Sequence, residues 1–297
     1  KGHTMGELRA ETATICTIIA KNYLAQARCL AESFYAQHPN GRMFALLIDQ
    51  PDGCFDPAAE PFTVVPMADL PLPEGVQMTF RYNVVELSTA VKPFFLEYLF
   101  DRYALDHLIY LDPDIYCYRP LAPLLDALQH SRVVLTPHLL APLDDSYRPS
   151  EIDILRVGSY NLGCIGLARS PELHTLLQWW QRHLLRDCVI DFARGLFVDQ
   201  RWIDMLPALF EGVAVLRHPG CNVAYWNLAQ RDVTHSASGW LVNGEPLIFF
   251  HFSGLILDDV EQISLHQNRY TLAKLPALRP LFRHYGSRLQ AHGVASV

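Results

Sequence analysis

Two aspartates, Asp112 and Asp114, are the residues whose type and spacing point most directly to chemistry. They flank Pro113 after an apolar segment, 108–111, which predicts a buried strand ending at the first aspartate. Two carboxylates two residues apart can reach one hard divalent cation from a turn, and such a cation could hold a diphosphate. Because Asp and Pro are also turn formers, an ordinary turn fits the same residues about equally well.

A histidine follows another apolar segment in the same way. His251 comes directly after residues 247–250, which predict a strand, and Gly254 three residues later allows an unusual backbone conformation or a close approach by a ligand. A neutral imidazole could provide a third metal ligand. Because a single histidine after a strand is more often structural, this position gains its interest from the two aspartates.

Amide and carboxylate side chains lie at two further strand ends. Asn161 precedes a predicted strand at 164–167, and Asp199 and Gln200 follow a short apolar run. Such groups can hold several sugar hydroxyls at once, because each hydroxyl both donates and accepts a hydrogen bond. As isolated residues they fit caps or turns better. The segment 220–227 mixes aromatic rings with asparagines, which suits either a sugar-stacking surface or an ordinary core contact.

The elements that must position these residues alternate between strands and helices. Residues 12–20 are mostly apolar and β-branched, as in a strand buried on both faces, and a helical pattern over 23–35 leads to a strand at 44–48. This opening predicts an α/β fold with right-handed crossovers, in which ligands bind at the carboxyl ends of the strands. The pattern further predicts strands at 62–65, 107–111, 132–136, 164–167, 213–216 and 247–250, helices at 88–103 and 171–185, and a helical tail at 272–291 that is broken by Pro276, Pro280 and Gly286.

The composition is that of an ordinary globular chain. Of 297 residues, half are hydrophobic and 19% are charged, and 24 basic against 31 acidic residues leave a net charge of −7. This composition argues against a disordered chain, a collagen-like chain and a basic nucleic-acid-binding protein. We expect a single domain over 5–297, and we interpret residues 1–4 as an artificial extension ahead of a natural start at Met5.

The cysteines and the apolar runs indicate a cytoplasmic location. Seven cysteines show no C-x-x-C pair, and an odd number cannot pair fully within the chain, so buried reduced thiols are the simplest interpretation. No apolar run reaches the roughly 18–20 residues of a membrane span, and the start has no hydrophobic signal core. The basic stretch at 279–288 is short, which gives little support to nucleic-acid binding and leaves peripheral contact with a membrane surface open.

Five segments, taken in order, resemble the motifs of GT-A-type nucleotide-sugar glycosyltransferases. They are most similar to the family-eight group of retaining enzymes and its bacterial relatives. The resemblance covers roughly residues 12–255 and implies a GT-A-like, Rossmann-like α/β fold with a mixed, mostly parallel central sheet flanked by helices. The segments are 14–23 at the first strand, 110–115 with the Asp-x-Asp motif, 160–163 (Tyr-Asn-Leu-Gly), 198–200 (Val-Asp-Gln) and 251–254 (His-Phe-Ser-Gly).

The resemblance implies a metal and nucleotide site. Asp112, Asp114 and His251 would bind Mn²⁺ or Mg²⁺ beneath the donor diphosphate, with Asp112 also near the ribose. The other donor contacts would come from Ala20, Lys21, Asn22 and Tyr23 beside the base, from Lys92, and from Gly254.

The resemblance also implies the catalytic residues. Asn161 and Asp199 would hold hydroxyls of the donor sugar, and Gln200 would lie near the anomeric carbon.

Two departures from the family pattern stand out. The family commonly carries an acidic residue in the first loop, which reads uracil, where this chain has Ala20 followed by Lys21. The family also follows its His-x-x-Gly element with a lysine, which this chain lacks. His266 or Arg269 could supply the missing cation.

The resemblance implies a metal-dependent glycosyltransferase of the hexosyltransferase type, acting with retention on a nucleotide-sugar, most simply a UDP-sugar. The acceptor would be a glycan, a lipid-linked sugar or a protein, as in bacterial glycan biosynthesis. A non-catalytic module that binds a nucleotide-sugar or glycan is an alternative with the same fold. A haloacid-dehalogenase-like phosphatase is less well supported, because Tyr116 stands where its Asp-x-Asp-x-Thr motif has threonine.

Overall fold

A central sheet organises the chain. The structure, a computed structural model, describes residues 13–257, 259 and 261–294, so the expected extension at 1–4 lies outside the described residues. Within that part, one seven-stranded sheet has the order β10-β6-β7-β4-β1-β2-β3. Its strands are β1 (Thr14–Ile19), β2 (Arg42–Leu47), β3 (Thr63–Pro66), β4 (His107–Leu111), β6 (Val133–Pro137), β7 (Tyr160–Ala168) and β10 (Val213–Val215).

The sheet is mixed and mostly parallel, as predicted. Strand β1 pairs in parallel with β2 and β4, β2 with β3, and β6 with β10. Strand β7 runs antiparallel to both of its neighbours, β4 and β6. The predicted strands in both halves of the chain are therefore confirmed, and β7 is the element that makes the sheet mixed.

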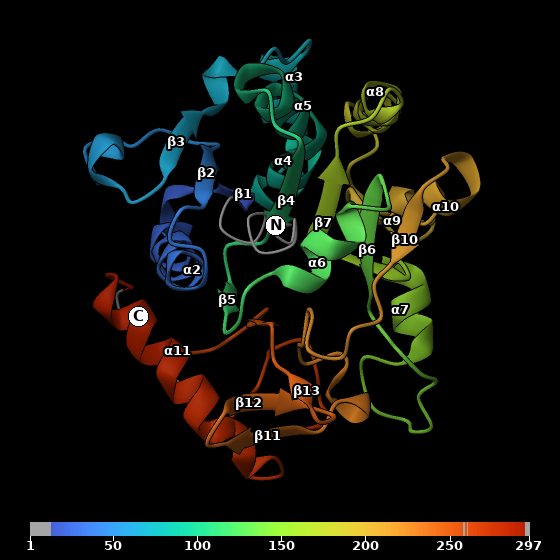
Figure 1. Ribbon diagram of the computed structural model, residues 1–297. Helices are drawn as coiled ribbons and strands as arrows, with labels where there is room; N and C mark the ends of the chain where they lie inside the picture. The colour runs from blue at the N-terminus through green and yellow to red at the C-terminus, as the bar shows by residue number, and fades with distance from the viewer. Residues whose placement is uncertain (1–12, 258, 260, 295–297) are drawn as a thin grey trace, which may run out of the picture.

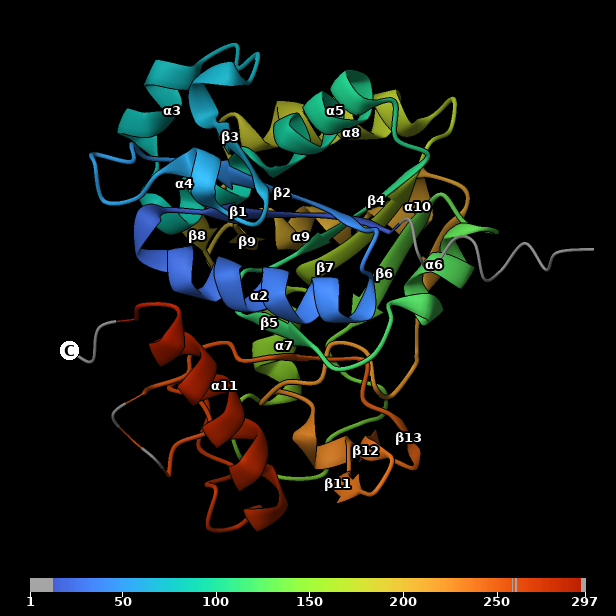
Figure 2. The same cartoon turned by 60° about the vertical axis from the view of Figure 1, so that its left-hand side comes forward.

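Helices cover both faces of this sheet (Figure 2). They are α2 (Leu24–Gln37), α5 (Lys92–Tyr103), α6 (Ala122–Leu128) and α8 (Leu173–Leu184). Strand β1 is buried along its whole length, and its side chains alternate between the two faces. Cys16 and Ile18 belong to the core beneath α5 and α8, whereas Ile15 and Ile19 belong to the core beneath α2 and α6. Burial on both faces explains why the strand reads as a continuous apolar run.

The single helix predicted at 88–103 is wrong in its extent. The structure has α4 (Val84–Ala90) and α5, which meet at Val91. Pro93 has no backbone N–H to continue an earlier helix, and it lies in the first turn of α5, where that N–H is not needed. Helix α4 begins at its own capping box, formed by Asn83 and Glu86.

A second group of elements lies beside the central sheet. Strands β5 (Ile115–Cys117) and β14 (Phe249–His251) form an antiparallel pair, so the predicted last strand exists but does not join the central sheet. A three-stranded antiparallel sheet of β11 (Val233–Ser236), β12 (Gly239–Val242) and β13 (Glu245–Pro246) was not predicted. Figure 1 shows these strands below the central sheet.

The C-terminal tail is more regular than predicted. Helix α11 (Arg279–Ala291) follows the 3-10 turn η5 (Pro276–Leu278) and continues through Pro280, in its first turn, and through Gly286. It runs beside α2 (Figure 1). The buried residues of this helix are Leu281, Phe282, Tyr285 and Leu289.

Among the described residues, no helix combines the length and apolar character needed to cross a membrane.

The remaining elements are short. These elements are α3 (Gly75–Arg81), α7 (Glu151–Val157), α9 (Gln200–Ile203), α10 (Leu206–Leu209), β8 (Ile190–Asp191), β9 (Leu196–Phe197), η1 (Lys21–Tyr23), η2 (Pro57–Ala59), η3 (Met67–Asp69) and η4 (Leu228–Gln230).

Candidate active site

Three strand ends bring Asp112, Asp114 and His251 together. Asp112 follows the last residue of β4, and its backbone N–H donates to the carbonyl of Gly163 on β7, at 2.8 Å. Asp114 precedes β5, which pairs with β14 so that Ile115 lies opposite His251. The His251 Nε2 atom lies 3.0 Å from Asp114 Oδ1 and 3.6 Å from Asp112 Oδ2. One ligand atom from each residue falls within 4.8 Å of the others.

The imidazole of His251 is held by an amide behind it. Its Nδ1 atom lies 3.3 Å from Asn222 Oδ1. The Asn222 Nδ2 group donates to Thr136 Oγ1 at 2.8 Å and to Asn161 Oδ1 at 3.0 Å, so the oxygen must face the histidine. The proton of the neutral imidazole therefore belongs on Nδ1, which leaves the Nε2 lone pair directed at the carboxylates.

These residues fit a divalent cation. Two carboxylates and an imidazole nitrogen are suitable ligands for Mn²⁺ or Mg²⁺, and the amide behind His251 is the kind of support that metal-bound histidines have. Burial lowers the pKa of His251 and the two carboxylates raise it, with a net rise. Burial is also the main cause of the raised pKa of Asp112. A cation would offset this burial of negative charge.

Close packing leaves no room for a side chain at Gly163. A Cβ atom there would lie 2.4 Å from His251 Cε1 and 2.8 Å from both Asn161 Oδ1 and Asp112 Oδ2. The phenol of Tyr110 supports the same group by donating to Asp112 Oδ1 at 2.7 Å. The strand ends and their glycine thus hold the three side chains in one arrangement.

A cleft of about 650 Å³ opens beside this group. Lys92 and Asp199 form an ion pair inside it, with 2.6 Å between Nζ and Oδ2 and only 2% of each side chain exposed. The lysine also donates to the carbonyl of Leu162 at 3.1 Å and lies over the ring of Tyr110. The cleft is lined by Asp112, Asn161, Gln200, His251 and His266, among others.

Two expected sugar-binding residues are engaged with the backbone around the cleft. The Asn161 Oδ1 atom accepts from the N–H of Gly163 at 3.1 Å, and its Nδ2 group lies 3.3 Å from Nε2 of buried His138. Gln200 accepts from the N–H of Leu162 at 2.9 Å and donates to the carbonyl of Val157 at 2.8 Å. Both amides are therefore fixed in orientation.

The expected nucleotide loop follows β1. Residues 21–23 form η1 after Ala20, and the N–H of Lys21 donates to Asp49 Oδ1 at 3.1 Å, while the lysine ammonium pairs with Asp52. Burial raises the pKa of the Tyr23 phenol, and the charges of Asp114 and Asp112 raise it further. Within the described part of the chain, no hydrogen bond or ion pair of the Asn22 side chain gives this residue a role.

The suggested replacement cations fall in different places. His266 lines the cleft, and a Cβ on Gly254, whose φ is +69°, would lie 2.6 Å from the His266 Cδ2 atom. Arg269 is 2% exposed, is absent from the cleft lining and pairs with Asp145 at 2.8 Å. The suggestion that Arg269 supplies the missing cation is therefore wrong, because a carboxylate 124 residues earlier already binds its guanidinium.

Two residues around the site were not predicted. Asn222 lies in the segment 220–227, and the mixture of aromatic rings and asparagines in that segment was the only signal in the sequence. The positive φ of Asn222, 54°, could not be predicted from the sequence. Arg148 lines the cleft from a loop that carries no motif.

Solved glycosyltransferases have a similar architecture. The galactosyltransferase LgtC, solved with donor and acceptor sugar analogues, matches with a TM-score of 0.54 and 16% identity, over 95% of this chain and 97% of that chain. The glycosyltransferase GlyE of Streptococcus pneumoniae TIGR4 matches with a TM-score of 0.54 and 11% identity, over 94% of this chain and 62% of that chain.

Sequence comparison finds relatives without an assigned activity. The Bacillus subtilis (strain 168) protein YfnF, described as uncharacterized, is 27% identical over 92% of this chain and 91% of its own length. YfnD of the same strain, also uncharacterized, is 23% identical over 84% of this chain and 80% of its own length. No protein family model matches the sequence. The resemblance is thus confirmed at the level of architecture: the chain has the GT-A fold of glycosyltransferases.

Proposed function

We propose that the chain is a metal-dependent glycosyltransferase that moves a hexosyl group from a UDP-sugar to an acceptor hydroxyl, with retention of configuration. The observation that carries this proposal is the convergence of Asp112, Asp114 and His251 beside a cleft, at the carboxyl end of β4 in a GT-A fold. The galactosyl transfer named for LgtC supports the hexosyl part of the proposal. The acceptor class is a glycan, a lipid-linked sugar or a protein.

The side chains of the cleft have distinct tasks in this proposal. When bound by Asp112, Asp114 and His251, Mn²⁺ or Mg²⁺ supplies positive charge for the leaving diphosphate. The Asp199 carboxylate, held in place by Lys92, accepts hydrogen bonds from hydroxyls of the donor sugar.

The fixed amides complete the sugar subsite. Asn161 and Gln200 are each held by backbone hydrogen bonds before substrate arrives, so little reorganisation is needed when it binds. In our proposal Gln200 lies beside the anomeric carbon, where a positioned amide stabilises developing positive charge.

The thiols support a reducing compartment as the site of action. All seven cysteines are free, and all but Cys54 are buried. Free thiols are typical of cytoplasmic proteins, so we place the enzyme in the cytoplasm.

A donor panel tests the proposed function. UDP-, GDP- and dTDP-sugars are incubated with Mn²⁺, and binding and hydrolysis are measured for the wild type, for Asp114→Ala and for Asp101→Ala, which removes an exposed carboxylate on α5 as a control. We expect metal-dependent turnover of a UDP-sugar that falls at least about 100-fold in Asp114→Ala and stays unchanged in Asp101→Ala.

Two results would contradict parts of the proposal. Binding without turnover, with or without candidate acceptors, would favour the non-catalytic module. Full metal-dependent activity in Asp114→Ala would show that the metal group is assigned wrongly. The configuration of the released sugar, followed by NMR, tests retention separately.

A further inference from the structure

A basic side chain in the cleft has no protein partner. Among the described residues that line the cleft, Lys92 is the lysine and Arg148 is the arginine. Lys92 is bound to Asp199 at 2.6 Å. Arg148 is exposed, and its guanidinium makes no ion pair or hydrogen bond with any described residue. The guanidinium is therefore available to a ligand.

A carboxylate beside Arg148, that of Asp153, is engaged elsewhere. Arg148 lies close enough to Asp153 to help lower its pKa, although hydrogen bonding from Ser150 is the main cause. The Asp153 Oδ2 atom accepts from both the N–H and the hydroxyl of Ser150, at 2.9 Å each, in the capping box of α7. Asp153 also lies 4.0 Å from the guanidinium of Arg156. The role of Asp153 is that of a helix cap, so it does not satisfy Arg148.

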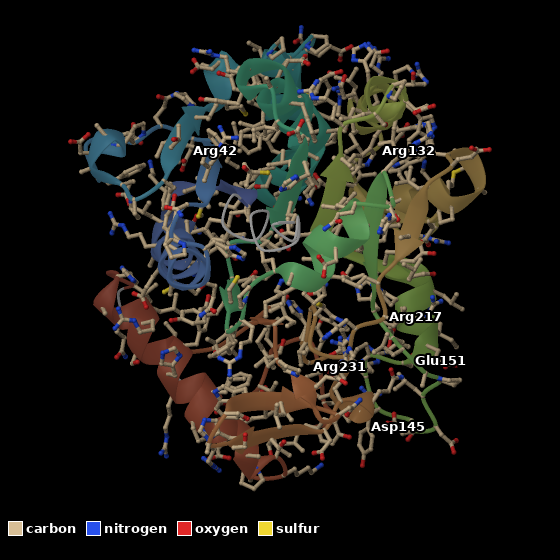
Figure 3. All side chains as sticks on the ribbon, in the orientation of Figure 1. Arg42, Arg132, Asp145, Glu151, Arg217 and Arg231 are labelled. Atoms are coloured by element: carbon tan, nitrogen blue, oxygen red, sulfur yellow. The ribbon has the colours of Figure 1, made fainter. Side chains whose placement is uncertain are left out.

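The main chain of Arg148 is held firmly from the other side. Its N–H donates to Asn268 Oδ1 at 2.7 Å, and its carbonyl accepts from the N–H of Asn268 at 3.2 Å. Arg269 donates to both carboxylate oxygens of Asp145 at 2.8 Å and to the carbonyl of Pro149 at 3.0 Å. Figure 3 places Asp145 on the loop that leads into α7. Asn268 and Arg269 thus form a clamp on the backbone at Arg148 and Pro149, while the Arg148 side chain stays free.

We propose that Arg148 binds a phosphate group of the substrate inside the cleft. The inference deepens the proposed glycosyl transfer and rests on it. A guanidinium offers paired N–H donors that match two phosphate oxygens, and its charge persists at any physiological pH. Because the clamp fixes the backbone beforehand, binding orders little more than one side chain.

The phosphate has two chemical sources in a glycosyl transfer. One is the diphosphate of the donor, and the other is a phosphate on the acceptor. Asp112 and His251 of the metal group line the same cleft as Arg148, so a ligand in this cleft could carry its phosphate on either substrate. The test below separates them.

The test compares Arg148→Gln with Arg182→Gln, which removes one exposed charge from α8 outside the cleft lining. Calorimetry with Mn²⁺ measures the affinities of UDP and of uridine, and a second titration adds inorganic phosphate to protein saturated with UDP and Mn²⁺. Thermal unfolding of both variants checks that they are folded, and Arg148→Lys tests whether charge alone is enough.

Each outcome decides the proposal. If Arg148 contacts the donor, Arg148→Gln should weaken the binding of UDP at least about 10-fold and leave the affinity for uridine unchanged. An acceptor contact predicts unchanged UDP affinity and loss of phosphate binding to the UDP complex. The assignment would be overturned if Arg148→Gln bound UDP and inorganic phosphate as tightly as the wild type does. It would also be overturned if Arg182→Gln lost as much affinity as Arg148→Gln.

Failure of the proposed function would look different. A wild-type protein that binds no UDP contradicts the UDP-sugar donor, and titration with inorganic pyrophosphate and Mn²⁺ then tests Arg148 directly. Pyrophosphate binding that disappears in Arg148→Gln would support the anion site even so. No pyrophosphate binding by the wild type would overturn both proposals.

Discussion

Replacement of Gly163 by alanine should disrupt the metal group while leaving the sheet intact. The added Cβ would lie 2.4 Å from His251 Cε1, which falls short of an ordinary contact of 3.4 Å by 1.0 Å. The same atom would lie 2.8 Å from Asp112 Oδ2. His251 is 3% exposed and cannot turn toward solvent, so the imidazole, the carboxylate or the strand must shift.

A shift of this size is large for a metal site. Ligand distances in such sites hold to within about 0.2 Å, and a misplacement of about 1 Å can lower turnover about 100-fold. We therefore expect Gly163→Ala to weaken Mn²⁺ binding at least about 10-fold, measured by calorimetry, and to reduce donor hydrolysis about 100-fold. Unfolding by urea shows whether the variant keeps its fold.

The same strand offers a matched control. Gly166 also lies in β7, but a Cβ there would meet Leu128, with its nearest atom, Cδ1, at 3.1 Å. Gly166→Ala should lose some stability and keep its affinity for Mn²⁺. A folded Gly163→Ala protein that binds Mn²⁺ as tightly as the wild type would refute the argument from packing.

Three further perturbations test the surroundings of the metal group. The carboxylates raise the pKa of His251 against the effect of burial, so protons compete with the metal for its imidazole. The affinity for Mn²⁺ should therefore rise with pH and level off once the pH exceeds that pKa. Calorimetry from pH 6 to 9 measures this, and a flat profile would count against His251 as a ligand. Lys92→Met should lower the free energy of unfolding, measured in urea, by about 3–5 kcal/mol, because it leaves the Asp199 carboxylate buried without its partner. An unchanged midpoint of the urea unfolding transition would argue against a charged pair. Asn222→Ala should weaken Mn²⁺ binding about 10-fold to 100-fold, because it removes the acceptor for His251 Nδ1. Thr136→Val removes only the hydroxyl behind Asn222 and should have a smaller effect. Equal effects of the two substitutions would assign Asn222 a purely structural role.

The sequence predicts the central sheet well because its strands are buried on both faces. Such strands read as continuous apolar runs, as β1 and β4 do. The helix boundary at Val91 and the continuity of α11 through Gly286 were predicted wrongly. The boundary follows local signals, Pro93 and the capping box of Asn83 and Glu86, which the apolar spacing over 88–103 obscured. Helix α11 continues through Gly286 because packing of its buried face can override local propensity. The small sheet of β11, β12 and β13 has short strands, and most of its residues are partly exposed, so periodicity gives little signal.

The candidate site shows a similar division. Asp112 and Asp114 were suggested by their spacing, and His251 was suggested as a third ligand by its place after a predicted strand. The pairing of β5 with β14, which the sequence does not show, brings His251 beside them. Arg269 was misplaced because sequence cannot show that a distant carboxylate, Asp145, binds it. Asn222 was not identified, because its role depends on a left-handed backbone conformation and on partners from other strands.

The charges of the cleft relate the two proposals to each other. Asp199 is compensated by Lys92, and Asp153 by its capping hydrogen bonds and by Arg156. The two aspartates of the metal group carry two negative charges that a divalent cation would balance when the nearby imidazole is neutral. Arg148 then remains as a positive charge without a protein partner in the described part of the cleft. Water hydrates this exposed guanidinium in the free protein, and a phosphate-bearing substrate would give it paired acceptors and an opposite charge that a neutral sugar lacks. Loss of phosphate affinity in Arg148→Gln, with Mn²⁺ affinity retained, would show that the metal group and the guanidinium act as separate parts of one anion-binding cleft.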